Sequence, residues 1–187
     1  MANYPYIIAS FPDLLLDFER HPLDVAATVA EVKGQLSETD GKLVDWLVFG
    51  LDGSHLTPHF YKVIRQTHCD FLVDWFEFDR KLRLAKVAHL EGMPVTEEFP
   101  ELDKAEIIFK VEDLFQREKL LDRLLWNKAA ELVSFDIFTI DTILSLIAQL
   151  HIVARWNRLD PETGAKMFRK LVDEVRGTFQ GINAEQL

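Results

Sequence analysis

The chain has 187 residues, of which 48% are apolar and 28% charged, a composition that is typical of an ordered globular protein and excludes disorder over most of its length. Its 31 acidic residues outnumber its 21 Lys and Arg residues, and the formal net charge of -10 argues against a nucleic-acid binder, which would need a basic face. The single cysteine, Cys69, excludes an internal disulfide and a cysteine-based metal cluster.

The N-terminal residues 4–16 are mostly apolar and contain two prolines. Because proline disfavours helix at the residue before it, Pro12 predicts an extended, buried lead-in that turns at Pro12 and Asp13. The stretch has no basic segment before it, and Asp13 and Asp17 interrupt it, so we expect no signal peptide. No apolar run reaches the ~18 residues needed to span a bilayer. We therefore expect a cytoplasmic protein without direct membrane insertion.

Two helices are predicted in the first third of the chain. The first follows Pro22, since proline suits the first turn of a helix and the apolar residues after it recur with a period of about 3.6. Ser37, with Asp40 three residues later, predicts the N-cap of the second helix, which ends near Gly50. Residues 51–55 (LDGSH) contain a turn-favouring Asp-Gly pair and are predicted to form a loop.

A long third helix is predicted over residues 57–91. Thr57 and Pro58 supply its start signals, and Gly92, followed by Pro94, supplies its stop signal. At ~1.5 Å per residue this helix would form a rod of roughly 50 Å, so it either kinks or extends under a cover of other helices. Its apolar seam consists of Phe60, Ile64, Thr67, Phe71, Trp75, Phe78, Leu82 and Ala85.

The second half of the chain begins with an acidic connection. Residues 92–106 contain two prolines and are predicted to form a hinge or long connection. Further helices are predicted over residues 116–134, 138–159 and 161–177, and the tail after residue 177 is predicted to be frayed.

The 138–159 segment is apolar almost all round its middle. Only a narrow polar line of Asp141, Ser145 and Gln149 crosses it. Such a helix is usually the central, most buried one of a bundle. The whole pattern predicts an all-α, or nearly all-α, single domain over residues 1–187: an elongated helical bundle with a short extended N-terminal lead-in.

No catalytic or cofactor motif is present in the sequence. It contains no GxGxxG, no phosphate-binding loop and no HExxH, so we expect no cofactor, no metal and no enzymatic activity. His55 and His59 stand four residues apart, but Pro58 disturbs the helical geometry and no third ligand is near. His68 and Cys69 are adjacent and therefore do not face each other on a helix, so Cys69 is predicted to be a buried structural residue.

A set of polar residues occurs on the helices of the second half. On helices, such groups mostly form local salt bridges, although paired carboxylates can also perform acid–base chemistry. We predict a structural polar cluster from Arg117, Glu118, Asp122, Asn127 and Arg155, with Arg123 and Glu131 nearby. The four tryptophans have helical spacing and are predicted to pack in the core: Trp46, Trp75, Trp126 and Trp156.

Two stretches carry a family resemblance: the opening YPYIIASFPDLLLD and residues 117–172. Within them, the more specific pieces are the stretch at residues 4–14, the residues Arg117, Glu118, Asp122, Trp126 and Asn127, and the triplet Ala154-Arg155-Trp156. With these residues the chain resembles a bacterial family known as domain of unknown function 2764.

The resemblance implies a function in ion transport. The family is encoded among the components of bacterial vacuolar/archaeal-type ATPases, in the place where the stalk adaptor of these enzymes, known as their C subunit, would be expected. It is similar to that adaptor in being helical, acidic and cytosolic. The adaptor joins the central rotor stalk to the membrane ring. The resemblance thus implies a non-catalytic stalk, coupling or assembly component of an ATPase that transports protons or sodium ions, peripherally associated with the membrane. The stalk adaptor itself has three helical repeats and is nearly twice as long, so this chain would be a reduced version.

Two other functions fit the sequence. One is a small helical enzyme or ligand-binding bundle with its site between the 116–134 and 138–159 helices, using Glu118, Asp122 and Arg155. The other is a self-associating helical regulator that pairs through the seam from Phe60 to Ala85.

A partner surface is predicted on the long helix 57–91 and the acidic connection after it. A rod of roughly 50 Å should leave part of its seam exposed, and exposed apolar surface with a charged rim marks contact sites. The predicted interaction residues are Phe71, Trp75, Phe78, Arg83 and Lys86. Residues 116–187 have no net charge, unlike the acidic remainder, and are the second candidate for close packing with a partner.

Overall fold

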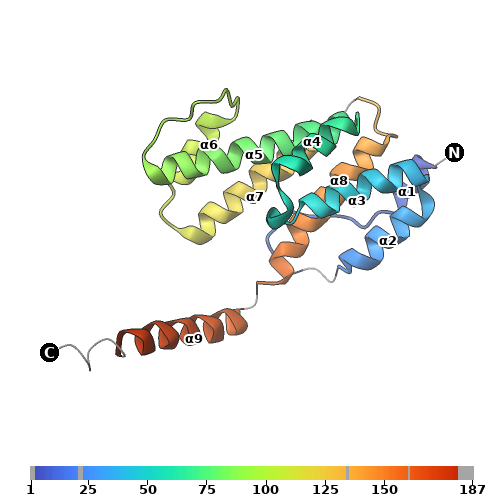
Figure 1. The fold of residues 1–187 in the computed structure, drawn as a ribbon. Helices are drawn as coiled ribbons and strands as arrows, with labels where there is room; N and C mark the ends of the chain where they lie inside the picture. Colours follow the sequence, from blue (N-terminus) through green and yellow to red (C-terminus); the bar gives the residue numbers. More distant parts are fainter. Residues whose placement is uncertain (1–2, 21–22, 134, 160, 181–187) are drawn as a thin grey trace.

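The computed structural model describes residues 3–20, 23–133, 135–159 and 161–180. Over these ranges the fold is all-α, as the sequence predicts, with helices joined by mostly short connections (Figure 1). The elements are α1 (Tyr4–Ser10), α2 (Val25–Gln35), α3 (Glu38–Gly50), the 3-10 turn η1 (Gly53–His55), α4 (Pro58–Gln66), α5 (Asp70–Glu91), α6 (Leu102–Phe109), α7 (Leu114–Glu131), α8 (Ile140–Asn157) and α9 (Pro161–Gln180).

Local capping sets most of the helix ends. The Ser37 side chain accepts a hydrogen bond from the Asp40 amide at the start of α3, and Thr57 does the same for Phe60 at the start of α4. Gly92 ends α5 with a left-handed φ of 67°, which glycine adopts without strain. These three signals were predicted from the sequence and are confirmed.

The predicted extended lead-in is wrong over its first half, because Tyr4–Ser10 forms helix α1. Asn3 caps this helix, and Pro5 lies in the first turn, where its missing N–H costs no hydrogen bond. The disfavouring effect of Pro12 is confined to Phe11, which has extended dihedrals of -66° and 142°. An irregular segment then covers residues 12–20.

The predicted single rod over residues 57–91 is also wrong, because it is divided into α4 and α5. His68 lies between them with a left-handed φ of 53°. The Thr67 hydroxyl donates to the Ile64 carbonyl at 2.7 Å and accepts from the Cys69 amide at 3.3 Å, so its side chain satisfies backbone groups at the break. The chain therefore kinks, which is one of the two alternatives left open by the length of the predicted helix.

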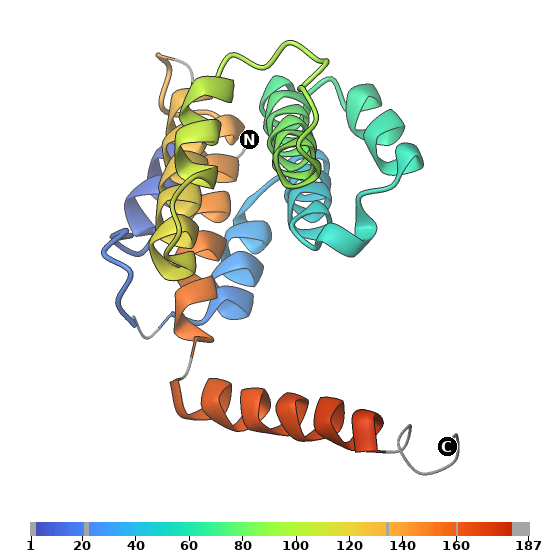
Figure 2. The ribbon, with the colours of Figure 1, turned by 90° about the vertical axis from the view of Figure 1, so that its left-hand side faces the viewer.

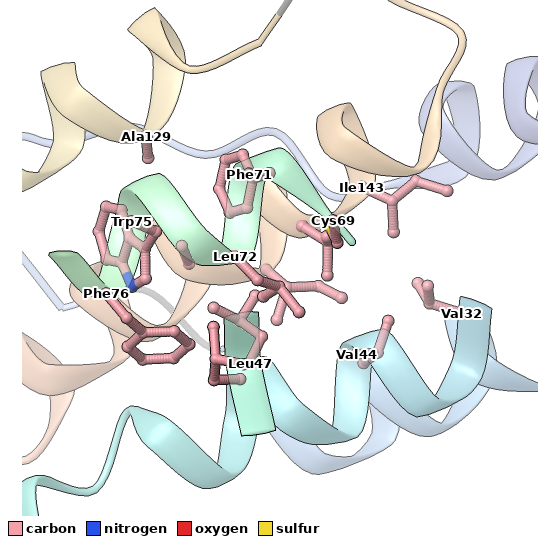
Figure 3. Close-up of a cluster of buried hydrophobic side chains, with 14 of the residues drawn as sticks. Val32, Val44, Leu47, Cys69, Phe71, Leu72, Trp75, Phe76, Ala129 and Ile143 are labelled. Carbon is pink, nitrogen blue, oxygen red and sulfur yellow. The ribbon is translucent and has the colours of Figure 1, made fainter. Parts of the chain in front are cut away.

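Helix α8 is the central helix of the fold, as predicted. It packs against α1, α2, α3 and α7, and most of its residues are buried. Figure 3 shows the larger core cluster, in which side chains of α5, including Phe71, Trp75 and Phe76, meet Leu47 and Val44 of α3. Burial of this apolar surface is the main term that stabilises the bundle.

A second, smaller core joins α5, α6 and α7. Phe99, from the connection after α5, packs on Phe78 with a ring-centroid distance of 5.7 Å. The predicted hinge over residues 92–106 therefore includes the beginning of α6 and a buried aromatic anchor. Its mobility, and the assignment of residues 1–187 to one domain, stay predictions. The remaining buried members of this core are Leu82, Ala85, Ala105, Ile108, Phe109 and Leu121.

Helix α9 projects from the bundle. Figure 1 and Figure 2 show it leaving the end of α8 and running away from the body of the molecule. Neither core cluster contains a residue of α9. The helix extends to Gln180, a little beyond the predicted end at residue 177, and the rest of the predicted frayed tail lies outside the described residues.

Candidate functional site

The predicted polar cluster has its centre at the crossing of α7 and α8. The Asp122 side chain is only 1% exposed. It accepts hydrogen bonds from Arg155 Nη1 at 2.6 Å and from Trp156 Nε1 at 2.7 Å. Arg155 also forms an ion pair with Glu118, one turn earlier on α7. Three of the five predicted members, Glu118, Asp122 and Arg155, are thus brought together.

The cluster is built to hold two helices together. Burial raises the pKa of Asp122, and the adjacent Arg155 guanidinium and the Trp156 indole act in the opposite direction. Both carboxylate oxygens of Asp122 accept hydrogen bonds from α8, so the side chain links the two helices through both of its oxygens. The geometry therefore favours the structural interpretation over acid–base chemistry.

The other two predicted members lie apart from this cluster. Asn127 is exposed on α7. The Arg117 Nε atom is buried and has no hydrogen-bond partner within the described part of the chain. Glu131, also considered in the sequence, pairs with Lys128 at 3.3 Å.

The predicted apolar interaction residues are buried in the isolated chain. Phe71, Trp75 and Phe78 are 2%, 3% and 4% exposed, so the expectation that part of this seam is accessible is wrong. The physical reason is the kink before α5, which lets the helix lie inside the bundle, with α3 on one side and α6 on another. Whether these residues reach a partner is untested, but they cannot do so through an exposed face of this structure.

Helix α5 does expose apolar surface, on a different face. Leu84, Val87 and Leu90 are between 43% and 73% exposed. Leu84 and Val87 line an open groove of about 390 Å³. Met93 and Val95, from the connection after α5, line it as well. We call this surface the α5 groove. It was not predicted, because the aromatic seam on the opposite side of the helix carries the stronger sequence signal.

The two predicted interaction cations flank the exposed part of α5. Arg83 Nε donates to Asp79 Oδ2 at 2.7 Å. Lys86 Nζ lies 3.8 Å from Glu118 Oε1 on α7. Both side chains remain about half exposed, so they are accessible at the rim of a contact surface, and their role there stays a prediction.

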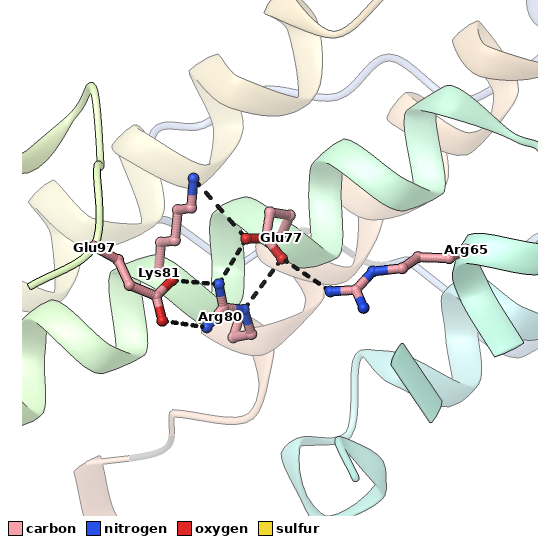
Figure 4. A network of polar contacts seen from close by, with 5 residues as sticks. All are labelled: Arg65, Glu77, Arg80, Lys81 and Glu97. Atoms are coloured by element: carbon pink, nitrogen blue, oxygen red, sulfur yellow. Dashed lines mark hydrogen bonds and ion pairs between the residues drawn. The ribbon is translucent and has the colours of Figure 1, made fainter. Parts of the chain in front are cut away.

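A charge network ties the acidic connection to α5, as Figure 4 shows. Arg80 lies between Glu77 and Glu97 and donates to both carboxylates, with a distance of 3.1 Å from its Nη1 atom to Glu97 Oε1. Arg65 and Lys81 each lie 3.9 Å from Glu77. The hydrogen bond from Arg80 holds the pKa of Glu77 below its ordinary range. The network fixes one wall of the α5 groove.

Helix α9 presents the most exposed apolar face among the described helices. Phe168, Leu171 and Val175 are spaced by three and four residues, as in a helix that packs on another helix, and they are 68%, 62% and 50% exposed. Met167 is also exposed beside them. The apolar spacing is visible in the sequence, where it predicts a helix but does not indicate a function. This spacing is the signal that could have identified the exposed surface of α9.

His55 and Cys69 have structural explanations. His55 stacks on the Phe49 ring at 3.9 Å, and its Nδ1 contacts the Phe49 carbonyl at 2.8 Å. Cys69 is buried, and burial raises the pKa of its thiol, which makes it a poor nucleophile. Among the described residues, no group of three or more His, Cys, Asp or Glu side chains could hold a metal ion.

Comparison with known proteins supports the family resemblance. A family model described as a protein of unknown function (DUF2764) matches residues 92–178, so the chain is similar to this family over α6, α7, α8 and most of α9. No curated protein and no solved structure matches the chain. Within the described ranges, no helix has both the length and the apolar character that a membrane crossing requires.

Proposed function

We propose that this protein is a non-catalytic adaptor that binds a helical partner through α9. The observation that carries the proposal is the exposed apolar face of α9. Four large side chains lie on one side of this helix, outside both cores, each at least 50% exposed. Exposed apolar surface of this kind usually marks a protein contact, because its burial is favourable.

The charges of α9 favour a protein partner over a lipid surface. The polar side of the helix carries Lys166, Arg169, Lys170 and Arg176, but also Asp173 and Glu174. A helix that binds an anionic membrane surface usually has a more uniformly basic polar face. Mixed charges beside an apolar stripe are instead typical of helix pairs, in which flanking ion pairs set the register.

We further propose that the partner belongs to a bacterial vacuolar/archaeal-type rotary ATPase, and that the protein is a stalk, coupling or assembly component similar to the stalk adaptor of these enzymes. The support is the family resemblance over residues 92–178, a segment that contains most of α9. In this proposal the chain contacts the central stalk and the membrane ring from the cytoplasmic side, without inserting into the bilayer. The α5 groove would be a second contact surface, and the half-exposed Arg83 and Lys86 of the same helix would contribute to the contact.

The proposal is tested by binding to reconstituted stalk subunits of such an ATPase. The test variant is Phe168→Glu combined with Leu171→Glu, which places two charges on the apolar face. The matched control is Lys166→Gln combined with Arg169→Gln, which changes the net charge equally on the polar face. We expect the apolar-face variant to weaken binding by at least about tenfold and the control to change it much less, because buried apolar anchors dominate helix-pair affinity.

Three outcomes would overturn parts of the proposal. No binding of the unmodified protein to any stalk subunit would exclude the ATPase assignment. Unchanged binding of the apolar-face variant would exclude α9 as the contact. Light scattering that shows a dimer, which the same variant dissociates, would identify a second copy as the occupant of α9.

A further inference from the structure

Two cavities of the bundle meet at the C-terminal end of α8. One, of about 300 Å³, lies between α3, α5, α7 and α8 and is lined in part by Trp75, Leu125 and Ile152. The other, of about 640 Å³, is an open groove along α2 and α3. His151 and Arg158 line both cavities. They stand seven residues apart, two helical turns, and therefore on the same side of α8. We call this place the α8 junction.

The cationic groups around the inner cavity are not equally neutralised. Arg83 is paired with Asp79, and Arg155 is paired with Asp122 and Glu118. Arg158 forms no ion pair with any described residue, and its charge instead acts on His151. Arg158 is exposed to solvent at the mouth of both cavities, so its guanidinium is accessible to an anion there.

His151 adds an unsatisfied hydrogen-bonding atom at the same place. Its Nε2 atom is buried and has no partner within the described ranges. Burial, helped by the charge of Arg158, lowers the pKa of His151. Buried polar atoms normally have partners, so the orphan Nε2 atom indicates a missing partner, and the solvent-exposed Arg158 guanidinium favours an anionic one. A negatively charged oxygen between them would satisfy both groups.

The groove beyond the junction determines what such an anion would carry. Its α2 and α3 walls are mostly small aliphatic side chains. Among the described lining residues of these two helices, the charged ones are Lys33 and Asp45, which form an ion pair with each other. An aliphatic body would fit this lining and would lose little by leaving water. The aliphatic wall residues are Val25, Ala26, Val29, Ala30 and Val48.

We propose that the α8 junction binds the acidic group of a small anionic amphiphile, whose aliphatic body lies in the groove between α2 and α3. His151 and Arg158 hold the acidic group, and Val29 and Ala30 contact the body. The inference does not rest on the adaptor function, since it involves no residue of α9. It assigns a ligand site to a part of the fold that shares no group with the exposed face of α9.

The probe is decanoate at concentrations at which it remains monomeric, added to the full chain. We expect saturable shifts of the His151 ring signals in NMR spectra and a higher His151 pKa in the bound state, because a nearby anion stabilises the imidazolium. Decanol, which lacks the charge, and inorganic phosphate, which lacks the aliphatic body, should each bind at least about tenfold more weakly than decanoate, because each lacks one of the two contacts.

Two variants and one control locate the site. Arg158→Gln should weaken decanoate binding by about tenfold, the usual effect of losing one charge-assisted hydrogen bond. Ala30→Trp, at an exposed position on the groove wall, should block decanoate. Lys104→Gln, on α6, removes the same charge elsewhere and should leave binding unchanged. Equal binding of decanoate by Arg158→Gln and the unmodified chain, or equal binding of decanol and decanoate, would overturn the proposal.

A final measurement distinguishes a free acid from a lipid headgroup as the source of the anion. If the natural ligand is a free acid, monomeric decanoate shifts His151 whereas vesicles containing phosphatidylglycerol do not. If it is a headgroup, the vesicles produce the same shifts, and these shifts are lost in Arg158→Gln. Absence of His151 shifts with both probes would overturn the site.

Discussion

The Asp122 carboxylate of α7 accepts a hydrogen bond from the indole nitrogen of Trp156 on α8 at 2.7 Å, and both side chains are buried. The same carboxylate accepts from Arg155, the preceding residue of α8. Two consecutive residues of one helix are therefore bound to one acceptor of another. Since neighbouring residues diverge by about 100° on a helix, this arrangement fixes the rotation of α8 about its axis.

Loss of this acceptor should strongly destabilise the fold. We expect Asp122→Ala to lower the free energy of unfolding by about 1–3 kcal/mol, because it leaves the buried Trp156 N–H without its acceptor and removes one of the two carboxylates that pair with Arg155. Chemical denaturation of the full chain measures this change. Glu118→Ala is the control. Because Glu118 is more exposed than Asp122, its substitution should lower the free energy of unfolding by at most about 1 kcal/mol. Equal effects of both substitutions would show that the buried carboxylate has no special role.

A second prediction concerns the close contact at the end of α3. A methyl group on Gly50 would lie 2.4 Å from the Phe76 ring and 2.5 Å from the Phe60 ring. Both rings are buried and packed edge to face against each other, so they have little room to move. Gly50→Ala should therefore destabilise the protein by about 1–3 kcal/mol in thermal or urea unfolding.

Gly34→Ala is the matched control for this substitution. Gly34 lies in α2, and nothing lies within 4 Å of the place where its methyl group would be. Since alanine favours helix over glycine, this change should stabilise the protein by about 0.5–1 kcal/mol. A stabilising effect of Gly50→Ala would contradict the packing described at α3.

The polar line of α8 has a role that the sequence did not indicate. The Ser145 hydroxyl donates at 2.7 Å to the Ala129 carbonyl, which lies in the last turn of α7, where backbone carbonyls lose their intrahelical partners. Gln149 donates to the Trp126 carbonyl at 3.4 Å. Ser145 and Gln149 of this line therefore face α7 and donate hydrogen bonds to it, whereas Asp141 accepts from the Cys69 thiol.

Substitutions on α8 should follow this geometry. Leu144→Ala removes a fully buried side chain and should cost about 2–5 kcal/mol. Ser145→Ala should cost less, about 1–2 kcal/mol, because it removes one hydrogen bond and leaves a buried carbonyl unsatisfied. Urea unfolding of the two variants tests both values, and a loss below about 0.5 kcal/mol for Leu144→Ala, well under the usual range, would contradict the central position of α8.

Local signals made much of this fold predictable. The start of α4 at Thr57 and Pro58, the end of α5 at Gly92 and the apolar character of α8 are each encoded by a few neighbouring residues. The break between α4 and α5 is not. His68 adopts a left-handed conformation, which residues other than Gly adopt only rarely, and no neighbouring Gly or Pro in the sequence marks this position.

The candidate sites were less predictable, because exposure is a property of the whole fold. The spacing of Phe71, Trp75 and Phe78 shows that they share a face, but only the kink and the neighbouring helices determine that this face is covered. The same reasoning applies to Phe168 and Leu171, which have a similar spacing but lie on a solvent-exposed side of α9. Ion pairing between Asp122 and Arg155 was predictable as a tendency, whereas the additional bond from Trp156 depends on the crossing angle of α7 and α8.

The network around Glu77 should make the connection after α5 sensitive to acid. The pKa of Glu77 is lower in the folded protein than in the unfolded chain, so its ionisation stabilises the fold. This contribution is complete above the ordinary glutamate pKa of about 4.3 and is lost as the pH falls through the lower folded value. The hydrogen-exchange protection factors of residues 93–99, which are corrected for the intrinsic pH dependence of amide exchange, should therefore fall in that range.

Arg80→Gln tests the same network at neutral pH. It removes the donor that joins Glu77 to Glu97, so hydrogen exchange in residues 93–99 should be faster already at neutral pH. The additional loss of protection at low pH should then be smaller than in the unmodified chain. Arg20→Gln, far from the network in sequence, serves as the control. Exchange that is identical in Arg80→Gln and the unmodified chain would show that the connection is held by Phe99 alone.

The last prediction concerns the independence of the body from α9. Both core clusters consist of residues before position 157, and the apolar side chains of α9 are exposed. A chain that ends at residue 159 should therefore unfold with a free energy within about 0.5 kcal/mol of the full chain, the usual range for changes away from packed contacts. Its amide spectrum should keep the signals of α1 to α8 in place. If the truncated chain instead loses a large part of its stability, α9 packs on the body in solution, and its apolar face would then be occupied by its own chain and not by a partner.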